Sequence, residues 1–294
     1  MCRTRPERMQ IVDSQIHIWA PSTPERPWPP VTKKPHRPEP LTRGILLREM
    51  DKARVSRAVL ISPSWEGIRN DLVLEAARAF PDRFAVMGRI DYEDPAAVEF
   101  FSALVSEPGV LGLRISFHTP ALQEGLAAGR YDWLWRAAEK ANVPLMVYAP
   151  HQVLHLIAPV AASHTGLRLI MCHLSIPILT KDEEAFTGLD RLLALARYPN
   201  VAAKASALPG HSSESYPYRN VESHLRRVYD SFGPQRIFWG TDFSRLHCSY
   251  RQAITMYTEE LPWLSSEDKE WIMGRGICRW LNWPLLDQPE PQSG

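Results

Sequence analysis

The chain has 294 residues, with 34 lysines and arginines against 33 aspartates and glutamates, so its formal net charge is +1. This balance argues against a dedicated nucleic-acid binder and against a protein held on membranes by a basic surface. Hydrophobic residues make up 45% and charged residues 23%, which excludes disorder over the whole chain and allows one large domain or two modest ones.

No apolar run reaches the roughly 18–20 residues that a bilayer span needs. The charged start of the chain leads into no apolar segment of the kind found in secretory signals. The four cysteines are scattered and form no CxxC pair, which argues against a disulfide framework or a cysteine-rich zinc site. We therefore expect a soluble, cytoplasmic protein.

Short apolar, β-rich runs alternate with longer amphipathic runs over almost the whole length. The strand-like runs are Ile11–His17, Arg57–Ile61, Phe84–Ile90, Val110–Ser116, Val143–Tyr148, Leu167–His173, Asn200–Ser206 and Arg236–Gly240. The helix-like runs are Arg43–Ala53, Asp71–Phe80, Pro95–Ser106, Tyr131–Ala141, Gln152–His164, Leu189–Arg197, Val221–Phe232, Tyr250–Glu260 and Ser266–Leu281.

Eight strands alternating with helices, with no break in composition, predict an α/β protein folded as a single (β/α)8 TIM barrel over residues 10–284. Residues 1–9 form an N-terminal extension in this interpretation, and residues 285–294 form a C-terminal tail. A doubly wound sheet is the alternative. It normally carries a glycine-rich turn after its first strand, whereas the turn after Ile11–His17 contains no glycine.

The longest irregular stretch is Ala20–Thr42, which holds eight prolines. In a barrel this loop follows the first strand, so it lies over the carboxyl ends of the strands, where barrel active sites are built. Two more long polar loops, Leu174–Gly188 and Ala207–Asn220, follow the sixth and seventh strands and belong to the same face. Loops of this length in a compact domain are usually functional or disordered.

Polar and ionisable residues stand at the carboxyl ends of most of the expected strands. Because a barrel brings these ends to one pocket, a single assumption about the fold gathers them into a candidate active site. In strand order they are Gln15, His17, Arg114, Tyr148, His173, Lys204, Ser206 and Asp242.

Several of these segments resemble the amidohydrolase superfamily, in its amidohydrolase-related branch (amidohydrolase 2). Val12–Trp19 resembles the opening strand of that branch, Met171–Ser175 its sixth-strand histidine motif and Phe238–Phe243 its eighth-strand aspartate motif. Val201–Leu208 is similar to its seventh strand. The resemblance runs over nearly the whole chain, from about residue 10 to 284, and implies a barrel with a hydrolytic site.

The sequence departs from the family pattern at two positions that usually bind metal. The family has His-x-His on the first strand, where this chain has Gln15-x-His17, and metal-binding members usually have a fifth-strand histidine, where it has Tyr148. A neutral amide and a protonated phenol are poor zinc ligands. If a divalent metal such as zinc is nevertheless present, His17, His173 and Asp242 are the residues expected to hold it.

The two substitutions favour the metal-independent lactonases of the branch, those similar to 2-pyrone-4,6-dicarboxylate lactonase and to the sugar lactonases. This resemblance implies that Asp242 is the general base that activates water, with His173, Tyr148 and His17 placed around the ester carbonyl. We expect no required cofactor. A site without a metal loses several kcal/mol of charge stabilisation, so its substrate must already be activated, as a conjugated lactone is.

The expected partner is a small, carboxylated substrate. Arg114 could clamp a carboxylate with two hydrogen bonds, although a salt bridge at the barrel rim is an equally good interpretation. Lys204 could meet an anionic group or pair with Asp13. The remaining residues expected to contact substrate are Gln15, Trp19 and, in a loop of type PSxxGxxN after the second strand, Ser64 and Trp65.

Two other functions stay open at this stage. One is a metal-dependent decarboxylase (a lyase) acting on an aromatic or enoic acid, and the other is a non-catalytic barrel that binds a small molecule. The presence of both His173 and Asp242 argues against the second, because a site that has lost its catalytic function has no need of both. The sequence leaves the substrate and the oligomeric state open, a homo-oligomer included.

Overall fold

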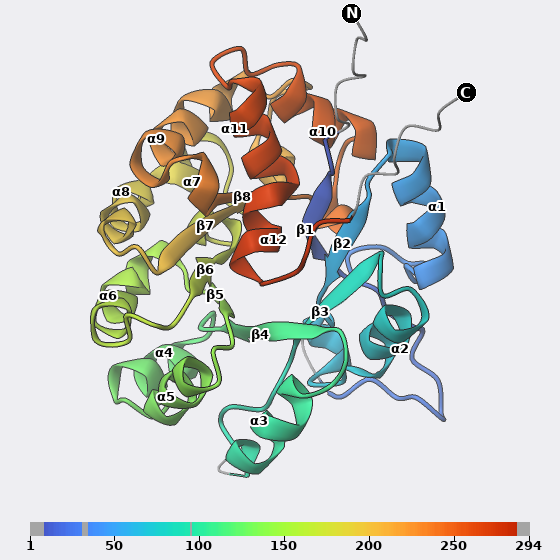
Figure 1. Cartoon of the computed structure of the whole chain (residues 1–294), viewed down its shortest axis with the longest axis vertical. Helices are drawn as coiled ribbons and strands as arrows, with labels where there is room; N and C mark the ends of the chain where they lie inside the picture. The colour runs from blue at the N-terminus through green and yellow to red at the C-terminus, as the bar shows by residue number, and fades with distance from the viewer. Residues whose placement is uncertain (1–8, 31–34, 95, 287–294) are drawn as a thin grey trace, which may run out of the picture.

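The computed structural model describes residues 9–30, 35–94 and 96–286. Most of residues 1–9 and 285–294, the expected extension and tail, therefore lie outside the described residues. Eight parallel strands follow one another in sequential order around a nearly closed barrel (Figure 1), which confirms the predicted (β/α)8 architecture. The strands are β1 Val12–Ile16, β2 Arg57–Leu60, β3 Phe84–Gly88, β4 Val110–Ser116, β5 Leu145–Tyr148, β6 Leu169–Met171, β7 Val201–Ser206 and β8 Ile237–Gly240.

Helices surround this ring of strands (Figure 1), as the alternating sequence pattern predicts. In the described residues, none of them is both long and apolar enough to cross a membrane. They are α1 Arg43–Ala53, α2 Asp71–Ala79, α3 Ala97–Val105, α4 Pro120–Ala127, α5 Asp132–Lys140, α6 Leu154–Ser163, α7 Asp182–Phe186, α8 Leu189–Leu193, α9 Glu222–Phe232, α10 Tyr250–Thr258, α11 Ser266–Glu270 and α12 Gly276–Trp280.

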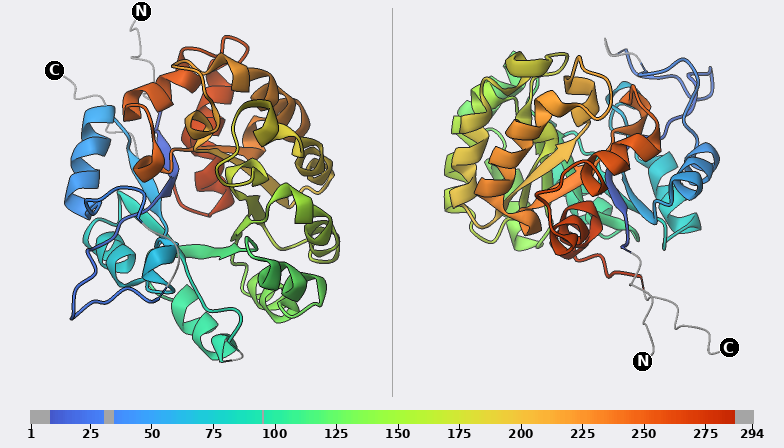
Figure 2. Two further views of the ribbon diagram at one scale, coloured as in Figure 1. Left: turned by 180° about the vertical axis from the view of Figure 1, so that it is seen from behind. Right: turned by 90° about the horizontal axis from the view of Figure 1, so that it is seen from above.

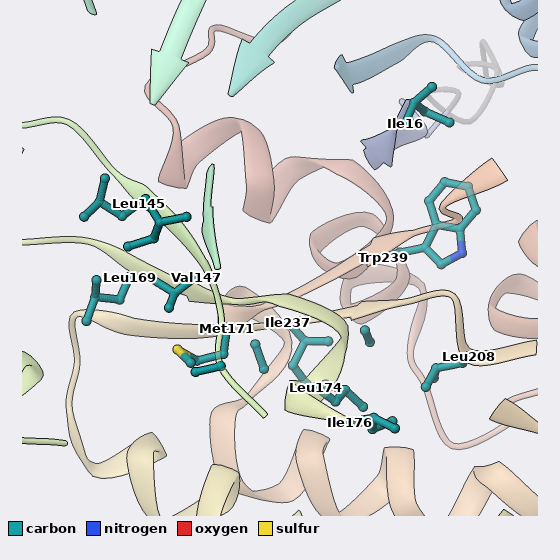
Figure 3. Packing of buried hydrophobic residues seen from close by; sticks show 14 of the residues in the cluster. Ile16, Leu145, Val147, Leu169, Met171, Leu174, Ile176, Leu208, Ile237 and Trp239 are labelled. Carbon is teal, nitrogen blue, oxygen red and sulfur yellow. The ribbon is translucent and has the colours of Figure 1, made fainter. Parts of the chain in front are cut away.

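The side chains of the strands divide into an outer and an inner layer. On β5 and β6, Leu145, Val147 and Leu169 belong to a large apolar cluster that also contains the inner faces of the helices, and Figure 3 shows them packed close together. Their neighbours Met146 and Ile170 belong to a second cluster inside the barrel. This alternation follows from the two-residue period of a strand.

One end of the barrel is closed by the last helix. The central α12 in Figure 1 lies across the ring of strands, where its residues Ile277 and Cys278 join Val12 and Phe238 in the inner cluster. Because this end is filled with apolar side chains, only the opposite end, at the carboxyl ends of the strands, is available for a site.

The junction between β1 and β8 is held mainly by side chains. The buried carboxylate of Asp13 accepts hydrogen bonds from the Thr241 amide (2.9 Å), the Thr241 hydroxyl and the Tyr250 hydroxyl (2.8 Å). Ser14 Oγ donates to the carbonyl oxygen of Trp239 (2.6 Å), and burial raises the pKa of Asp13 to about 6. These contacts fix the first and last strands relative to each other, and the candidate site residues follow directly after both.

The described parts of the long segment between β1 and α1 lie beside the open end of the barrel, against residues that follow β2 and β8. Figure 2 shows it, in blue, projecting beyond the helices at one end of the molecule. Near its start Arg26 forms an ion pair with the buried Glu66 (3.2 Å), which follows β2. Near its end Arg37 donates to the carbonyl oxygen of Phe243 (3.2 Å), just after β8. Residues 31–34 of this predicted loop lie outside the described residues.

Candidate active site

A cavity of about 260 Å³ opens at the carboxyl ends of the strands. Eight of the ten residues expected from the sequence to act on or bind a substrate line it, which are Gln15, His17, Ser64, Trp65, Arg114, Tyr148, His173 and Asp242. The other two, Trp19 and Lys204, are fully buried behind the lining. Trp19 supports the wall, since its ring packs edge-on against that of Trp65 (5.3 Å between centroids).

Gln15 reaches the cavity because β1 is bulged. The register pairs Asp13 with Ala58 and Ile16 with Leu60. Between these two pairs the chain advances by three residues on β1 but by only two on β2. A bulge changes which side chains face which side of a sheet. Asp13 therefore points outward to the seam with β8, whereas Gln15, only two residues later, lines the cavity.

Gln15 joins two neighbours in one hydrogen-bonded chain. The ammonium group of Lys204 donates to Gln15 Oε1 (2.5 Å), and Gln15 Nε2 lies 3.1 Å from His17 Nε2. His17 Nδ1 lies 2.7 Å from the carbonyl oxygen of Ile61, which can only accept, so Nδ1 carries the proton. Burial lowers the pKa of His17 to about 3, so the imidazole is neutral and its Nε2 accepts from Gln15.

Lys204 is therefore part of the first-strand arrangement and does not pair with Asp13. It also donates to the carbonyl oxygen of Ser14 (3.3 Å) and contacts Met146 Sδ (3.1 Å). In the described part of the chain it forms no ion pair with a carboxylate. Burial lowers its pKa to about 8, so the ammonium form is the main form at neutral pH.

The residues that follow β6, β7 and β8 adopt backbone conformations that side chains rarely tolerate. His173, Ala207 and Asp242 have φ values of 54°, 62° and 50°, in the left-handed region. Such a residue costs roughly 1–2 kcal/mol, and conformations of this kind persist at sites where function requires them. In this protein they turn the chain sharply, so that all three residues line the cavity.

Asp242 is the carboxylate of the cavity. It is 1% exposed, and its Oδ1 has no hydrogen-bond donor among the described residues. His17 Nε2 lies 3.6 Å from Oδ1, and Arg245 lies 3.9 Å from Oδ2. Burial raises the pKa of Asp242, and the positive charges around it oppose that effect. A buried acceptor without a donor is costly and calls for an explanation in the chemistry of the site.

His173 is held by the hydroxyl of Ser206, whose Oγ lies 2.9 Å from Nδ1. Burial lowers its pKa well below the usual value, so it too is a neutral imidazole. Its ring stands edge-on to Tyr148, with 6.0 Å between centroids. The hydroxyl of Tyr148 donates its proton to the carbonyl oxygen of Ile176 (3.0 Å). That proton is therefore not available to a substrate carbonyl.

Positive charge dominates the lining. Arg89, Arg114 and Arg245 line the cavity beside Asp242, which is the single carboxylate among the described lining residues, and Lys204 lies beneath. Arg89 donates through Nε to the carbonyl oxygen of Ser62 (2.6 Å), and Arg114 donates to the carbonyl oxygen of Ile115. In the described part of the chain neither has a carboxylate partner.

The positive charges of Arg89 and Arg114 repel each other. Burial and the charge of Arg114 together lower the pKa of Arg89 to about 10. The Nε of Arg114 is buried without a hydrogen-bond partner among the described residues, and the guanidinium lies over the ring of Tyr148 at 5.7 Å. Buried, like-charged groups without counter-ions are stabilised when an anion binds between them.

Several lining residues do not appear among the candidates that the sequence supplied. Arg89 follows β3, and the rule that singled out the other strand ends also applies to it. Arg245 and His211 stand in loops after β8 and β7. His36 comes from the proline-rich segment, where its Nδ1 lies 2.8 Å from Ser244 Oγ and its ring 4.7 Å from that of Trp65. No local pattern in the sequence marks His36.

The residues of the site do not fit a metal ion held by three protein ligands. Among the described residues, no three histidine, cysteine, aspartate or glutamate side chains form a group that could hold one. At the position of the first histidine of His-x-His, the Gln15 oxygen is taken by the Lys204 ammonium. A cation at this point would meet a buried positive charge, which opposes its binding.

Comparison with known proteins places this arrangement in context. The chain is 26% identical over 251 residues to an L-fucono-1,5-lactonase from Burkholderia ambifaria, covering 79% of each protein. An amidohydrolase from Burkholderia multivorans with bound zinc superposes with a TM-score of 0.78 at 20% identity, over 94% of this chain and 100% of that one.

A probable 2-pyrone-4,6-dicarboxylic acid hydrolase from Acinetobacter baumannii, with citric acid bound, superposes with a TM-score of 0.75 at 15% identity. It is covered completely, and 93% of this chain is matched. Likenesses at this level of identity establish the fold. The family model for amidohydrolases matches residues 12–282, which is nearly the whole described barrel. The chain therefore belongs to the amidohydrolase family, in its amidohydrolase 2 branch.

Proposed function

We propose that the protein hydrolyses small, carboxylated lactones or related activated esters, with Asp242 as the general base and without a required metal. The observation that carries this proposal is the state of Asp242. It lines the cavity, and its buried Oδ1 receives no hydrogen bond from the described residues. An acceptor in that state is suited to take a proton from a water molecule. Burial raises its pKa, which makes the carboxylate a stronger base.

The charges of the cavity support a substrate that carries at least one carboxylate. Arg114 is the clamp in this proposal, and its unpartnered Nε supports that role. Arg89, also without a carboxylate partner among the described residues, lies close enough to Arg114 for burial and the charge of Arg114 to lower the pKa of Arg89 to about 10. An anion bound beside the two guanidinium groups would relieve this repulsion.

The roles of the other candidate residues follow from where their protons are. His173 is a hydrogen-bond donor to the substrate when Ser206 donates to its Nδ1, because the proton then resides on Nε2. Tyr148 forms the wall and supports Arg114 through its ring. His17 positions Gln15 next to Asp242, since both of its ring nitrogens already have partners.

The names of the similar proteins support the same reaction class. One is described as a lactonase and another as a probable hydrolase of a dicarboxylic acid that is a cyclic ester. A lactone is also the chemically reasonable choice for a site that offers hydrogen bonds and positive side chains, because its carbonyl is more reactive than that of an amide.

The test is a screen of lactones in weakly buffered solution, following proton release. L-fucono-1,5-lactone, 2-pyrone-4,6-dicarboxylate and an uncharged δ-lactone are compared at equal concentration. We expect hydrolysis, with a lower KM for the carboxylated lactone than for an uncharged lactone of similar size. Release of carbon dioxide from an aromatic acid in place of lactone hydrolysis would support the decarboxylase instead.

The assignment of the base is tested by Asp242→Asn, which keeps the shape and removes the basic oxygen. We expect kcat to fall by roughly 10²–10⁴-fold while binding of the lactone stays measurable. Asp230→Asn, at an exposed aspartate on α9, is the control and is expected to be neutral. Near-native turnover by Asp242→Asn would show that another group activates the water.

A further inference from the structure

The most informative feature that the proposed reaction leaves unused is the chain of contacts behind the cavity, from Lys204 through Gln15 to His17. Lys204 is 0% exposed, and Gln15 is 1% exposed. A buried ammonium group is expensive unless its protons are satisfied. Here one of its bonds goes to a side-chain amide that lines the cavity, so its charge acts directly on the wall of the site.

The orientation of the Gln15 amide follows from this chain. An ammonium group can only donate, so the Gln15 oxygen must face Lys204 and the NH2 group must face away from it. On that side one N–H meets the Nε2 of His17, which accepts because Nδ1 donates to the carbonyl oxygen of Ile61. The NH2 group has a second N–H, and the side chain that carries it lines the cavity beside Asp242.

The charge of Lys204 also changes the strength of this donor. A positive charge on the amide oxygen draws electron density from the nitrogen, which makes the N–H groups more acidic and better hydrogen-bond donors. Of the three residues expected around the carbonyl, Tyr148 donates to Ile176 and His17 donates to Ile61, so only His173 of that set has a proton to offer beside Gln15. Gln15 is thus a donor whose direction is fixed from both sides.

We propose that Gln15 is a catalytic residue that donates a hydrogen bond to the carbonyl oxygen of the substrate, and that Lys204 is a positioning residue that orients and polarises it. This inference rests on the proposed hydrolysis of a lactone. It gives the glutamine the electrophilic task that a cation performs in metal-dependent hydrolases. Lys204 supplies the positive charge from within the protein.

The step balances without any further reactant. Asp242 takes a proton from water, the water oxygen forms a bond to the carbonyl carbon, and the carbonyl π electrons move onto its oxygen, where the Gln15 N–H stabilises the negative charge. The oxygen then reforms the double bond, the ring C–O bond breaks, and the ring oxygen takes the proton back from Asp242. Gln15 and Lys204 end the cycle with all their protons.

The kinetic test uses Gln15→Met, Lys204→Met and the double variant, because methionine has a length similar to both side chains and cannot donate. With a lactone that the screen identifies, we expect Gln15→Met to lower kcat by about 10²-fold, the usual effect of losing one such donor, with a smaller change in KM. Lys204→Met lowers kcat on the native background. It causes no further loss when Gln15 is already methionine, since it acts through Gln15.

Two kinetic results would overturn the inference while leaving the proposed hydrolysis intact. One is near-native kcat in Gln15→Met. The other is a double variant whose loss equals the product of the two single losses, because Lys204 would then act independently of Gln15. Lys52→Met, at an exposed lysine on α1, is the matched control and should leave kcat unchanged.

A second measurement needs no substrate. In ¹H–¹⁵N spectra the side-chain amide of Gln15 is identified as the signal that disappears in Gln15→Met. We expect Lys204→Met to move this signal upfield and Lys52→Met to leave it in place. If the Gln15 signal did not move in Lys204→Met, Lys204 would not polarise the Gln15 amide. Failure of the native protein to hydrolyse any lactone, with the expected shift present, would reject the proposed function and the catalytic role of Gln15 together.

Discussion

At the scale of single residues, the site is built from groups whose ordinary protonation behaviour has been changed by burial. His17 and His173 are held neutral, Asp242 becomes a stronger base, and Lys204 loses part of its affinity for protons. Strongly shifted groups gathered around one cavity are typical of catalytic centres. The pattern gives each group one chemical role that can be tested separately.

The first residue-scale prediction concerns pH. Asp242 must be ionised to act as a base, so kcat should fall as the pH drops through a value above 3.8, the ordinary value from which burial raises its pKa. Lys204 must be protonated to polarise Gln15, so kcat should also fall as the pH rises through about 8. Burial is the main cause of the lowered pKa of Lys204; the charge of Arg114 lowers it further, whereas the neighbouring Cys172 and Asp242 raise it.

The pH profile of Lys204→Met, corrected for spontaneous hydrolysis, checks this assignment. The alkaline fall should be absent from this variant and the acid fall retained, because Asp242 is unchanged. If kcat of Lys204→Met still fell at alkaline pH, a group other than Lys204 would be responsible for that fall.

The second residue-scale prediction concerns the carboxylate clamp. Arg114→Met should raise KM for a carboxylated lactone by roughly 10- to 100-fold, which is the worth of a charge-assisted hydrogen bond, with little change in kcat. It should scarcely affect an uncharged lactone. Arg136→Met, at an exposed arginine on α5, serves as the control. An unchanged KM for the carboxylated substrate would show that Arg114 does not bind the carboxylate of the substrate.

At the scale of elements, the geometry of the site depends on how β1 meets β8. The Asp242 amide donates to the carbonyl oxygen of Gln15 (2.9 Å), so the proposed base and the proposed donor are tied through their backbones. Just before it, Gly240 lies so close to β1 that an added Cβ would stand 2.6 Å from Ser14 Oγ and 3.1 Å from the Gln15 amide nitrogen. Only glycine fits this approach.

Gly240→Ala should therefore push the two strands apart. We expect a loss of roughly 1–3 kcal/mol in the free energy of unfolding, measured by urea denaturation, together with reduced kcat. Gly210→Ala is the matched control, because an added Cβ there meets nothing within 4 Å. If Gly240→Ala proved as stable and active as the native protein, the close contact at this seam would have no part in holding the site.

Much of the element order could be predicted from the sequence. β4 and α1 have the predicted bounds, and α11 begins at Ser266, where the sequence predicts a helix to start, since apolar periodicity and capping are local signals. The expected helix Gln152–His164 begins later, with a 3₁₀ turn before Leu154, and the expected helix Leu189–Arg197 ends as a 3₁₀ turn. These differences lie at helix ends, whose positions are less well determined by the apolar pattern of the sequence than the existence of the helix.

Three helical regions differ more. The short α7 lies within Leu174–Gly188, which the sequence predicts as a loop. No helix was predicted at α4, although Thr119 caps it and Pro120 starts it, because its apolar pattern is weak. The single expected helix Ser266–Leu281 is divided by a π-helical turn at Trp271–Arg275. There the chain packs closely against β1 and β8, and an added Cβ at Gly274 would meet the carbonyl oxygen of Gln10 at 2.2 Å. Such tertiary contacts leave no local trace in sequence.

At the scale of the whole molecule, the net charge of +1 conceals a strongly uneven distribution. Arg89, Arg114, Arg245 and Lys204 gather at or beneath the cavity, where Asp242 is the lining carboxylate. Arg114, Lys204 and Asp242 could be predicted from the sequence, because a barrel brings the carboxyl ends of its strands to one place. Arg89, which follows β3, was not among the candidates although the same rule applies to it. His36 and Arg245 come from loops, whose paths depend on contacts between distant segments, so the sequence alone could not place them.

In the proposed reaction, positive side chains and an oriented amide take the place of a metal ion in this barrel. The direct measurement is lactone hydrolysis by protein treated with a chelator and shown by elemental analysis to hold far less than one metal per chain. We predict that this protein keeps the kcat of the untreated sample, and that adding zinc does not raise it. Loss of turnover on chelation, restored by one equivalent of a divalent metal, would show that the enzyme requires a metal ion and would contradict the proposed mechanism.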